Sequence, residues 1–295
     1  MSAQAVGLNA SKAADPVRYA SLSHPGVSYS YDMFTQAGQA IRNDPSVLGG
    51  LESRHLIADG ESQSVGRMVT YVNAVQPLAH AYDGFLVHSR GATGSALAQA
   101  PLTPIPVPSP APIRTDGPSP VRVLQSETDV NAGARQDDTS TFRLWEMAGT
   151  AHVDAYTLGI GLVDVGDGQV DIAMFNAMRV PPAAGCALPI NTGPSHWLVQ
   201  DAMVRLAQWV RRGREPAHAP RIEVTSFTPR TYARDANDNV LGGIRTPLVD
   251  VPVANVSVAG QSGPGLLCQL VGSTIPFSDA KLASLYESHD SSVKQ

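Results

Sequence analysis

The feature that most constrains this fold is a set of four short apolar runs, each about as long as a β-strand. The runs cover residues 55–58, 83–88, 121–125 and 141–146. Strands that are buried on both faces of a parallel sheet have such continuous apolar sequences. Helical periodicity appears around these runs, at residues 31–43, 65–75 and 195–212. The pattern predicts an α/β fold with a mostly parallel sheet and helices on both faces, and it leaves open whether the sheet is shortened.

Two segments depart from this alternation. Residues 101–120 contain eight prolines, which exclude an interior helix or a central strand and predict a surface connection. After Pro220 the sequence changes to short β-like runs interrupted by glycine and proline. We therefore expect a main domain of residues 1–220. We also expect an irregular, β-rich C-terminal extension of residues 221–295 that packs on the same core.

Composition and charge exclude several functional classes. The formal net charge of −5 and the pI of about 5.9 argue against nucleic-acid binding, which normally requires a basic surface. A membrane-spanning helix needs roughly 18 or more consecutive apolar residues, and no such run is present, so we expect no membrane insertion. The amino terminus lacks the basic and apolar regions of a secretory signal.

The two cysteines, Cys186 and Cys268, are too few for a disulfide scaffold and lack the spacing of metal ligands. They are either two buried thiols or one bridge in an exported protein, and the sequence does not choose between these. A bridge would close a loop of about 80 residues and add about 4 kcal/mol of stability in the loop-entropy model. The localisation stays open, because a bridge between the two cysteines would favour export and the absence of a secretory signal argues against it.

The strongest local motif is Gly-Glu-Ser-Gln-Ser at residues 60–64, where the first apolar run meets a helical segment. A serine on such a tight strand-to-helix turn projects its hydroxyl above the sheet, and the usual pattern is G-x-S-x-G. Here Ser64 replaces the last glycine, and its small side chain makes the replacement tolerable. Ser62 is therefore the candidate nucleophile. The alternative is that Ser62 only caps the following helix.

A serine nucleophile needs a base, and the base needs an orienting carboxylate. In enzymes with this turn, the order along the chain is serine, acid, histidine. That order is present here, because Glu127 and Asp129 follow the third run and His152 follows the fourth. His88 also ends a run, but it precedes the acid. The carboxyl ends of parallel strands meet at one edge of an open sheet, so these residues are expected to lie close together.

Within each class the sequence favours one residue without excluding the others. His152 is the favoured base, and His196, at the start of a helix, is its main rival. Asp129 is favoured over Glu127 as the acid, and the residue not used is expected to fix its loop through backbone hydrogen bonds. The backbone N–H of Gln63, directly after the nucleophile, is the expected oxyanion donor. No residues have metal-ligand spacing, so neither a metal nor another cofactor is predicted.

Seven segments of the chain form a specific combination. They are residues 60–67, 82–91, 125–129, 145–152, 191–209, 241–247 and 268–277. This combination resembles a group of bacterial proteins, the alpha/beta hydrolase domain proteins, an esterase group of the α/β-hydrolase superfamily. The resemblance implies that residues 1–220 are the catalytic domain. It also implies that Ser62 is the nucleophile, His152 the base, and Asp129 or Glu127 the acid.

By this resemblance the activity is hydrolysis of small-molecule carboxylic esters through an acyl-enzyme intermediate. A catalytically inactive interaction module and an acyltransferase on the same scaffold remain as alternatives. Proteins of this group are usually longer, so the resemblance also implies that strands ahead of the first run are missing here, with the loop that supplies a second oxyanion donor. A second copy of the chain could cover the exposed sheet edge and form a homo-oligomer.

Overall fold

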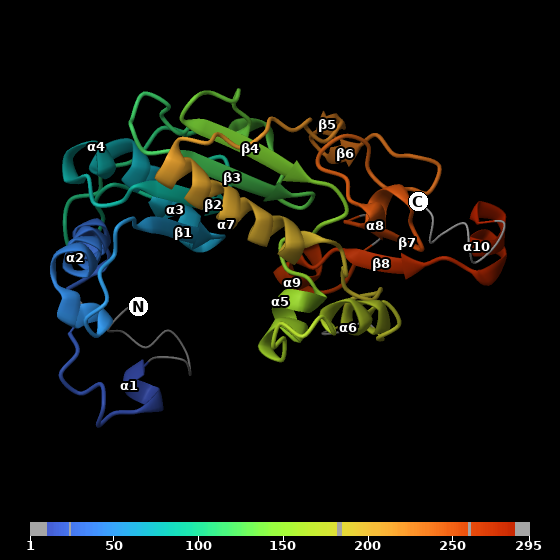
Figure 1. The fold of residues 1–295 in the computed structure, drawn as a ribbon, viewed down its shortest axis with the longest axis horizontal. Coiled ribbons are helices and arrows are strands. Elements are labelled where there is room, and N and C mark those ends of the chain that lie inside the picture. The colour runs from blue at the N-terminus through green and yellow to red at the C-terminus, as the bar shows by residue number, and fades with distance from the viewer. Residues whose placement is uncertain (1–10, 24, 182–184, 259–260, 287–295) are drawn as a thin grey trace.

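The computed structural model describes residues 11–23, 25–181, 185–258 and 261–286. Its centre is a four-stranded parallel sheet with the strand order β1-β2-β3-β4 (Figure 1). The strands are β1 (Ile57–Glu61), β2 (Gly84–His88), β3 (Val121–Ser126) and β4 (Phe142–Met147). Because the strands are parallel and helices pack on both faces, the predicted α/β fold is confirmed.

Different helices cover the two faces of the sheet. On one face lies α3 (Gln63–Thr70), which continues through a π-helical turn at Tyr71–Val75 into α4 (Gln76–Ala79). On the other face lies α7 (Ser195–Arg212), with the bounds that the sequence predicted. Successive side chains of a strand point to opposite faces of the sheet, so each strand contributes side chains to the packing on both faces.

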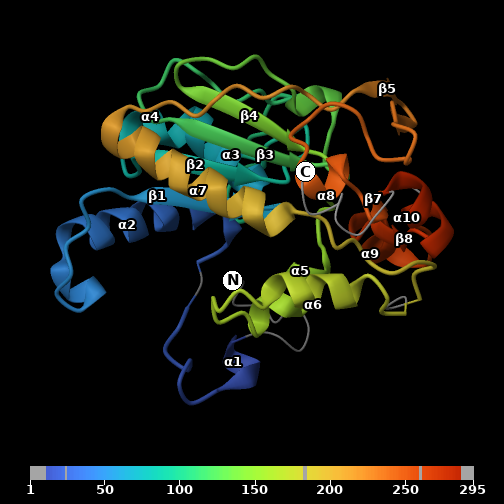
Figure 2. The same ribbon diagram turned by 45° about the vertical axis from the view of Figure 1, so that its right-hand side comes forward.

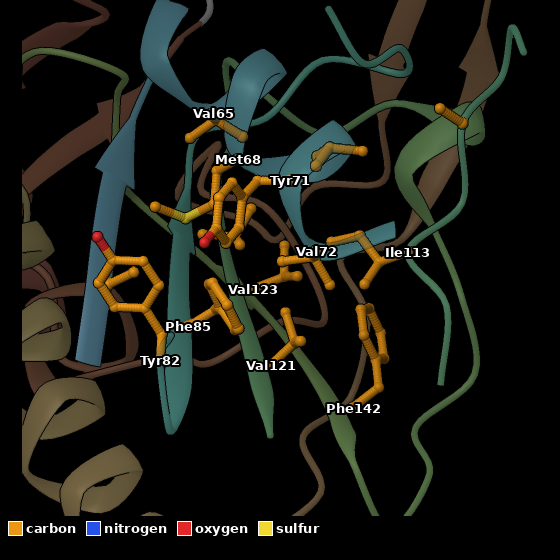
Figure 3. Close-up of a cluster of buried hydrophobic side chains, with 14 of the residues drawn as sticks. Val65, Met68, Tyr71, Val72, Tyr82, Phe85, Ile113, Val121, Val123 and Phe142 are labelled. Carbon is orange, nitrogen blue, oxygen red and sulfur yellow. The ribbon is translucent and has the colours of Figure 1, made fainter. Parts of the chain in front are cut away.

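Two separate apolar cores result from this alternation. Phe85 and Val123 pack against Met68 and its neighbours on the α3 side, and Figure 3 shows these side chains between the helical segment and the strands. Leu86 packs with Leu206 of α7 on the other side. The sheet is therefore held between two apolar layers, and its carboxyl edge is left to polar residues.

The first strand lies two residues later than the sequence predicted. β1 begins at Ile57 instead of residue 55, and it includes Asp59 and Gly60, which lie beyond the predicted run of residues 55–58. The whole of β1 pairs with β2, from Ile57 beside Gly84 to Glu61 beside His88. The hydrogen bonds of this parallel pairing outweigh the local preference of Asp-Gly for a turn.

The remaining helices lie outside the central sheet. α2 (Ser30–Asn43) contacts it through Phe34, whose ring stacks on Tyr82 with centroids 4.6 Å apart. In both views α5 and α6 lie beyond the carboxyl ends of the strands (Figure 1 and Figure 2). The other α-helices are α1 (Ser11–Ala14), α5 (Ala155–Leu158), α6 (Val170–Ala177), α8 (Pro247–Asp250), α9 (Gly265–Leu270) and α10 (Asp279–Leu285). Short 3-10 helices span Val27–Tyr29, Pro45–Leu48, Ala132–Ala134 and Ile160–Leu162.

The C-terminal part of the chain contains two small antiparallel sheets. One pairs β5 (Val224–Phe227) with β6 (Arg230–Tyr232), and the other pairs β7 (Ala254–Ser257) with β8 (Ser273–Pro276). A third apolar cluster joins residues from both sides of position 220, among them Val130, Ala148, Ile222, Tyr232 and Val256. This part of the chain therefore shares buried contacts with the loops that follow β3 and β4.

Cys186 and Cys268 form a disulfide with their Cα atoms 5.4 Å apart and 82 positions apart in the chain. We expect reduction of this bond to lower the free energy of unfolding by about 4 kcal/mol, because an open chain has more conformational freedom when unfolded. Denaturant unfolding with and without a reductant measures the difference. The paired substitution Cys186→Ser and Cys268→Ser should give the same loss, and an unchanged midpoint would contradict the expectation.

Candidate active site

Ser62 lies on a sharp turn between β1 and α3. Its backbone has φ 56° and ψ −119°, a conformation that non-glycine residues rarely adopt and that clusters at functional sites. The Ser62 N–H donates to the carbonyl of His88 at 3.1 Å, which continues the β1–β2 pairing to the turn. The Ser64 hydroxyl accepts from the Glu61 N–H at 3.0 Å and donates to the Glu61 carbonyl at 2.8 Å. Ser64, which stands where the usual motif has glycine, thus closes the turn with its side chain.

Gly60 lets α3 approach the end of β1. A Cβ atom at this position would lie 2.8 Å from Cε of Met68, so a larger residue would require Met68 to move. The close approach brings the start of α3 directly after Ser62. Gln63 is the first residue of that helix, where backbone N–H groups have no acceptor within the helix. Gln63 therefore places a backbone N–H without an intrahelical acceptor directly after Ser62.

His152 lies in the loop after β4 and contacts the nucleophile candidate. Its Nε2 lies 2.8 Å from Oγ of Ser62, although the two residues are 90 positions apart. Its Nδ1 lies 2.6 Å from Oδ1 of Asp129, in the loop after β3. The structure thus brings Ser62, His152 and Asp129 into one hydrogen-bonded series at the carboxyl edge of the sheet.

The two candidate acids occupy different environments. Asp129 faces the imidazole, and its other carboxylate oxygen accepts a short hydrogen bond from the Ser126 hydroxyl. Glu127 is fully buried, and its carboxylate accepts from the N–H of Gly149 instead. Burial raises the pKa of Glu127 to about 7. Of the two candidates, Asp129 is the one placed at His152.

The site environment shifts the pKa values of two neighbouring histidines in opposite directions. The hydrogen bond to Asp129 raises the pKa of His152, and burial partly opposes this effect. Burial lowers the pKa of His88 to about 4, so this imidazole is neutral at ordinary pH. A protonated His152 is thus stabilised by its acid partner, while His88 adds no positive charge beside it.

Sequence reasoning did not place His88 in the site, because it precedes the acid along the chain. Its Nδ1 lies 3.7 Å from Oε1 of Glu61, the residue before Ser62. The signal that could have found it is strand register, since residues at the ends of adjacent parallel strands lie side by side. Its backbone carbonyl also holds the N–H of Ser62.

His196, the rival base, lies elsewhere. Its ring stacks on Tyr156 with centroids 4.0 Å apart and contacts Trp197 at 3.7 Å. Neither ring nitrogen has a hydrogen-bond partner among the described residues. The structure therefore does not bring His196 to Ser62.

The described residues contain neither a group of metal ligands nor a helix suited to crossing a membrane. Within these ranges, no three or more His, Cys, Asp or Glu side chains are arranged so that they could hold a metal ion. None of the described helices combines the length and apolar character that crossing a membrane requires.

Comparison with known proteins agrees with this geometry at the level of the family. A family model described as "Alpha/beta hydrolase domain" matches residues 1–295. No curated protein and no solved structure matches the chain. The family match extends over the complete chain and indicates a hydrolase-type function. On this evidence the chain belongs to the alpha/beta hydrolase domain family.

Proposed function

We propose that this protein is a serine hydrolase that cleaves carboxylic esters. The observation that carries the proposal is the series of two short contacts, 2.8 Å from Ser62 Oγ to His152 Nε2 and 2.6 Å from His152 Nδ1 to Asp129 Oδ1. An alcohol side chain becomes a nucleophile when an oriented imidazole can accept its proton. The turn that holds Ser62 also leaves its side chain exposed, so that substrate and water can reach it.

In the acylation step, Ser62 Oγ attacks the ester carbonyl carbon while its proton moves to Nε2 of His152. The carbonyl oxygen becomes an oxyanion, which the Gln63 N–H stabilises as a hydrogen-bond donor. The bond to the alcohol oxygen then breaks, and the proton on Nε2 passes to the departing alcohol. Asp129 stabilises the imidazolium that exists between these transfers.

In the deacylation step, a water molecule attacks the acyl-enzyme carbonyl and gives its proton to Nε2. The bond to Ser62 Oγ breaks, and the proton returns to the serine. The sum is one ester and one water converted into one carboxylic acid and one alcohol. No electron acceptor, metal or other co-reactant enters this balance.

The proposal is tested with short-chain p-nitrophenyl esters and a fluorophosphonate probe. We expect ester cleavage, covalent labelling at Ser62 by mass spectrometry, and loss of cleavage in proportion to labelling. Folded protein that neither cleaves the esters nor reacts with the probe would favour the inactive interaction module. Transfer of the acyl group to an added alcohol, at the expense of free acid, would favour the acyltransferase.

We expect kcat/KM to rise with pH through a midpoint above the ordinary histidine pKa of 6.5, because only neutral His152 can accept the Ser62 proton. The sign follows from the contact with Asp129, which favours the protonated imidazole and raises its pKa. A pH–rate profile with a non-ionisable ester measures the midpoint. In Asp129→Asn the residual activity should have its midpoint at lower pH. A wild-type midpoint below the ordinary value would contradict the expectation.

A further inference from the structure

Glu127 is a fully buried carboxyl group that the proposed chemistry does not use directly. It lies in the acid loop, which we define as residues 127–131, directly after β3. Its Oε1 accepts a hydrogen bond at 2.6 Å from the N–H of Gly149, in the histidine loop, which we define as residues 148–152. A buried carboxyl is costly unless it is hydrogen-bonded, so a carboxyl at this place requires a specific partner. The Gly149 N–H is such a partner.

Two further hydrogen bonds join the same loops. The backbone N–H of Glu127 donates to the carbonyl of Thr150 at 3.2 Å. The backbone N–H of His152 donates to Oγ1 of Thr128 at 2.7 Å. Together with the Glu127–Gly149 bond, they set the position of one loop along the other. The contact between Asp129 and the His152 imidazole depends on that position.

The geometry of Gly149 explains why no other residue fits the turn that donates to Glu127. Gly149 has φ +73°, and a Cβ atom here would lie 2.7 Å from Cγ2 of Val249 and 3.0 Å from Cγ2 of Val256. The turn is therefore restricted to glycine and holds its N–H against the buried carboxyl. Without Glu127 this buried donor would lose its partner, which destabilises the turn that carries His152.

The C-terminal extension also contacts the acid loop directly, through hydrogen bonds that do not involve the histidine loop. The Tyr232 hydroxyl donates a short hydrogen bond to the backbone carbonyl of Glu127. The guanidinium of Arg230 donates to the carbonyl of Val130 at 3.0 Å. The positive charge of Arg234 also acts on the Glu127 carboxyl and opposes the effect of burial on its pKa. Residues far along the chain thus hold the segment that carries Asp129.

We propose that Glu127 is a positioning residue that fixes the register of the acid loop and the histidine loop, and that the C-terminal extension supports it through Tyr232. The inference rests on the proposed function, because the register matters only if His152 must contact Asp129 and Ser62 together. Asp129 contacts the imidazole of His152, and Glu127 fixes the relative position of the two loops that carry these residues. This gives the C-terminal extension a role in the active site without supplying a reacting group.

The test compares Glu127→Leu with Glu127→Gln. Leucine removes the acceptor of the Gly149 N–H, and we expect kcat per active site to fall by about 10- to 100-fold with little change in KM, as for other groups that orient a catalytic residue. Glutamine keeps an amide oxygen at the same place and should restore most of the activity. Active sites are counted with the fluorophosphonate probe. The low-field proton resonance of the His152 imidazole is recorded for each variant and assigned by its absence in His152→Ala.

Glu146 supplies the matched control. It is equally buried, but its carboxylate binds Arg135 and the N–H of Ile222. Glu146→Leu should lower stability while leaving kcat per labelled site and the His152 resonance unchanged. If Glu127→Leu does not fold, Tyr232→Phe takes its place, since it removes only the hydroxyl that binds the Glu127 carbonyl.

The outcomes separate the two proposals. Loss of the His152 resonance in Glu127→Leu, with its return in Glu127→Gln, supports the positioning role even if the wild type cleaves no ester. A wild type that neither cleaves nor labels overturns the esterase proposal alone. Wild-type kcat per site and an unchanged resonance in Glu127→Leu, or in Tyr232→Phe where that variant replaces it, overturn the positioning role.

Discussion

Ser62→Ala is expected to abolish hydrolysis of p-nitrophenyl acetate, with kcat falling by at least about 10⁴-fold. The reason is that no other hydroxyl is held at both an exposed turn and 2.8 Å from Nε2 of His152 among the described residues. The residual rate should come from hydroxide attack assisted by the Gln63 N–H. The measurement is initial-rate kinetics on enzyme that is free of wild-type contamination.

Ser140→Ala is the matched control for this variant. Ser140 is an exposed serine next to the amino end of β4, at the opposite end of the strand from the site. It should retain the wild-type rate and still react with the fluorophosphonate at Ser62. A Ser62→Ala enzyme that keeps the wild-type rate would show that the hydrolysis uses another nucleophile.

The second large effect is expected for Asp129→Asn, with a fall in kcat of about 10⁴-fold and little change in KM. The amide can hydrogen-bond to Nδ1 in the wrong sense, which favours the imidazole tautomer with a proton on Nε2. That tautomer cannot accept the proton of Ser62. Steady-state kinetics at the pH optimum measure the loss, and circular dichroism confirms that the fold is retained.

Two comparisons make this prediction specific. Asp137→Asn changes an exposed carboxylate in the connection between β3 and β4 and should leave kcat unchanged. Glu127→Gln should lose far less activity than Asp129→Asn, because its carboxylate faces Gly149 and not the imidazole. The reverse order of effects would assign the acid role to Glu127.

Much of the architecture could be predicted from the sequence because it depends on local patterns. The apolar runs at 121–125 and 141–146 are strands within one residue of their predicted bounds, and the helix at 195–212 has the predicted ends. Continuous apolar sequence identifies a strand buried on both faces, and helical periodicity identifies a face that packs on it. The error at β1 arose where pairing with β2 overrode the turn preference of Asp59 and Gly60.

Some residues of the candidate site could be identified from local sequence, and others could be identified only from tertiary contacts. Ser62 could be proposed from its immediate neighbours, since the strand-turn-helix context is encoded within a few residues. The choice between Asp129 and Glu127 could not be made in this way, because they are two positions apart and both follow β3. Whether a side chain faces His152 or Gly149 depends on how two loops pack against each other, which short-range patterns do not specify.

The sequence by itself determined the alternation of strands and helices and the residues that stand at the carboxyl ends of the strands. The tertiary structure alone decided that Asp129 faces the imidazole, that His88 lies beside the Glu61 carboxylate, and that Tyr232 supports the acid loop. The physical reason is range: the tendency of a segment to form a strand or a helix follows from the hydrophobic periodicity and backbone preferences of near neighbours. Contacts between residues many positions apart exist only after the sheet has brought its strands into register.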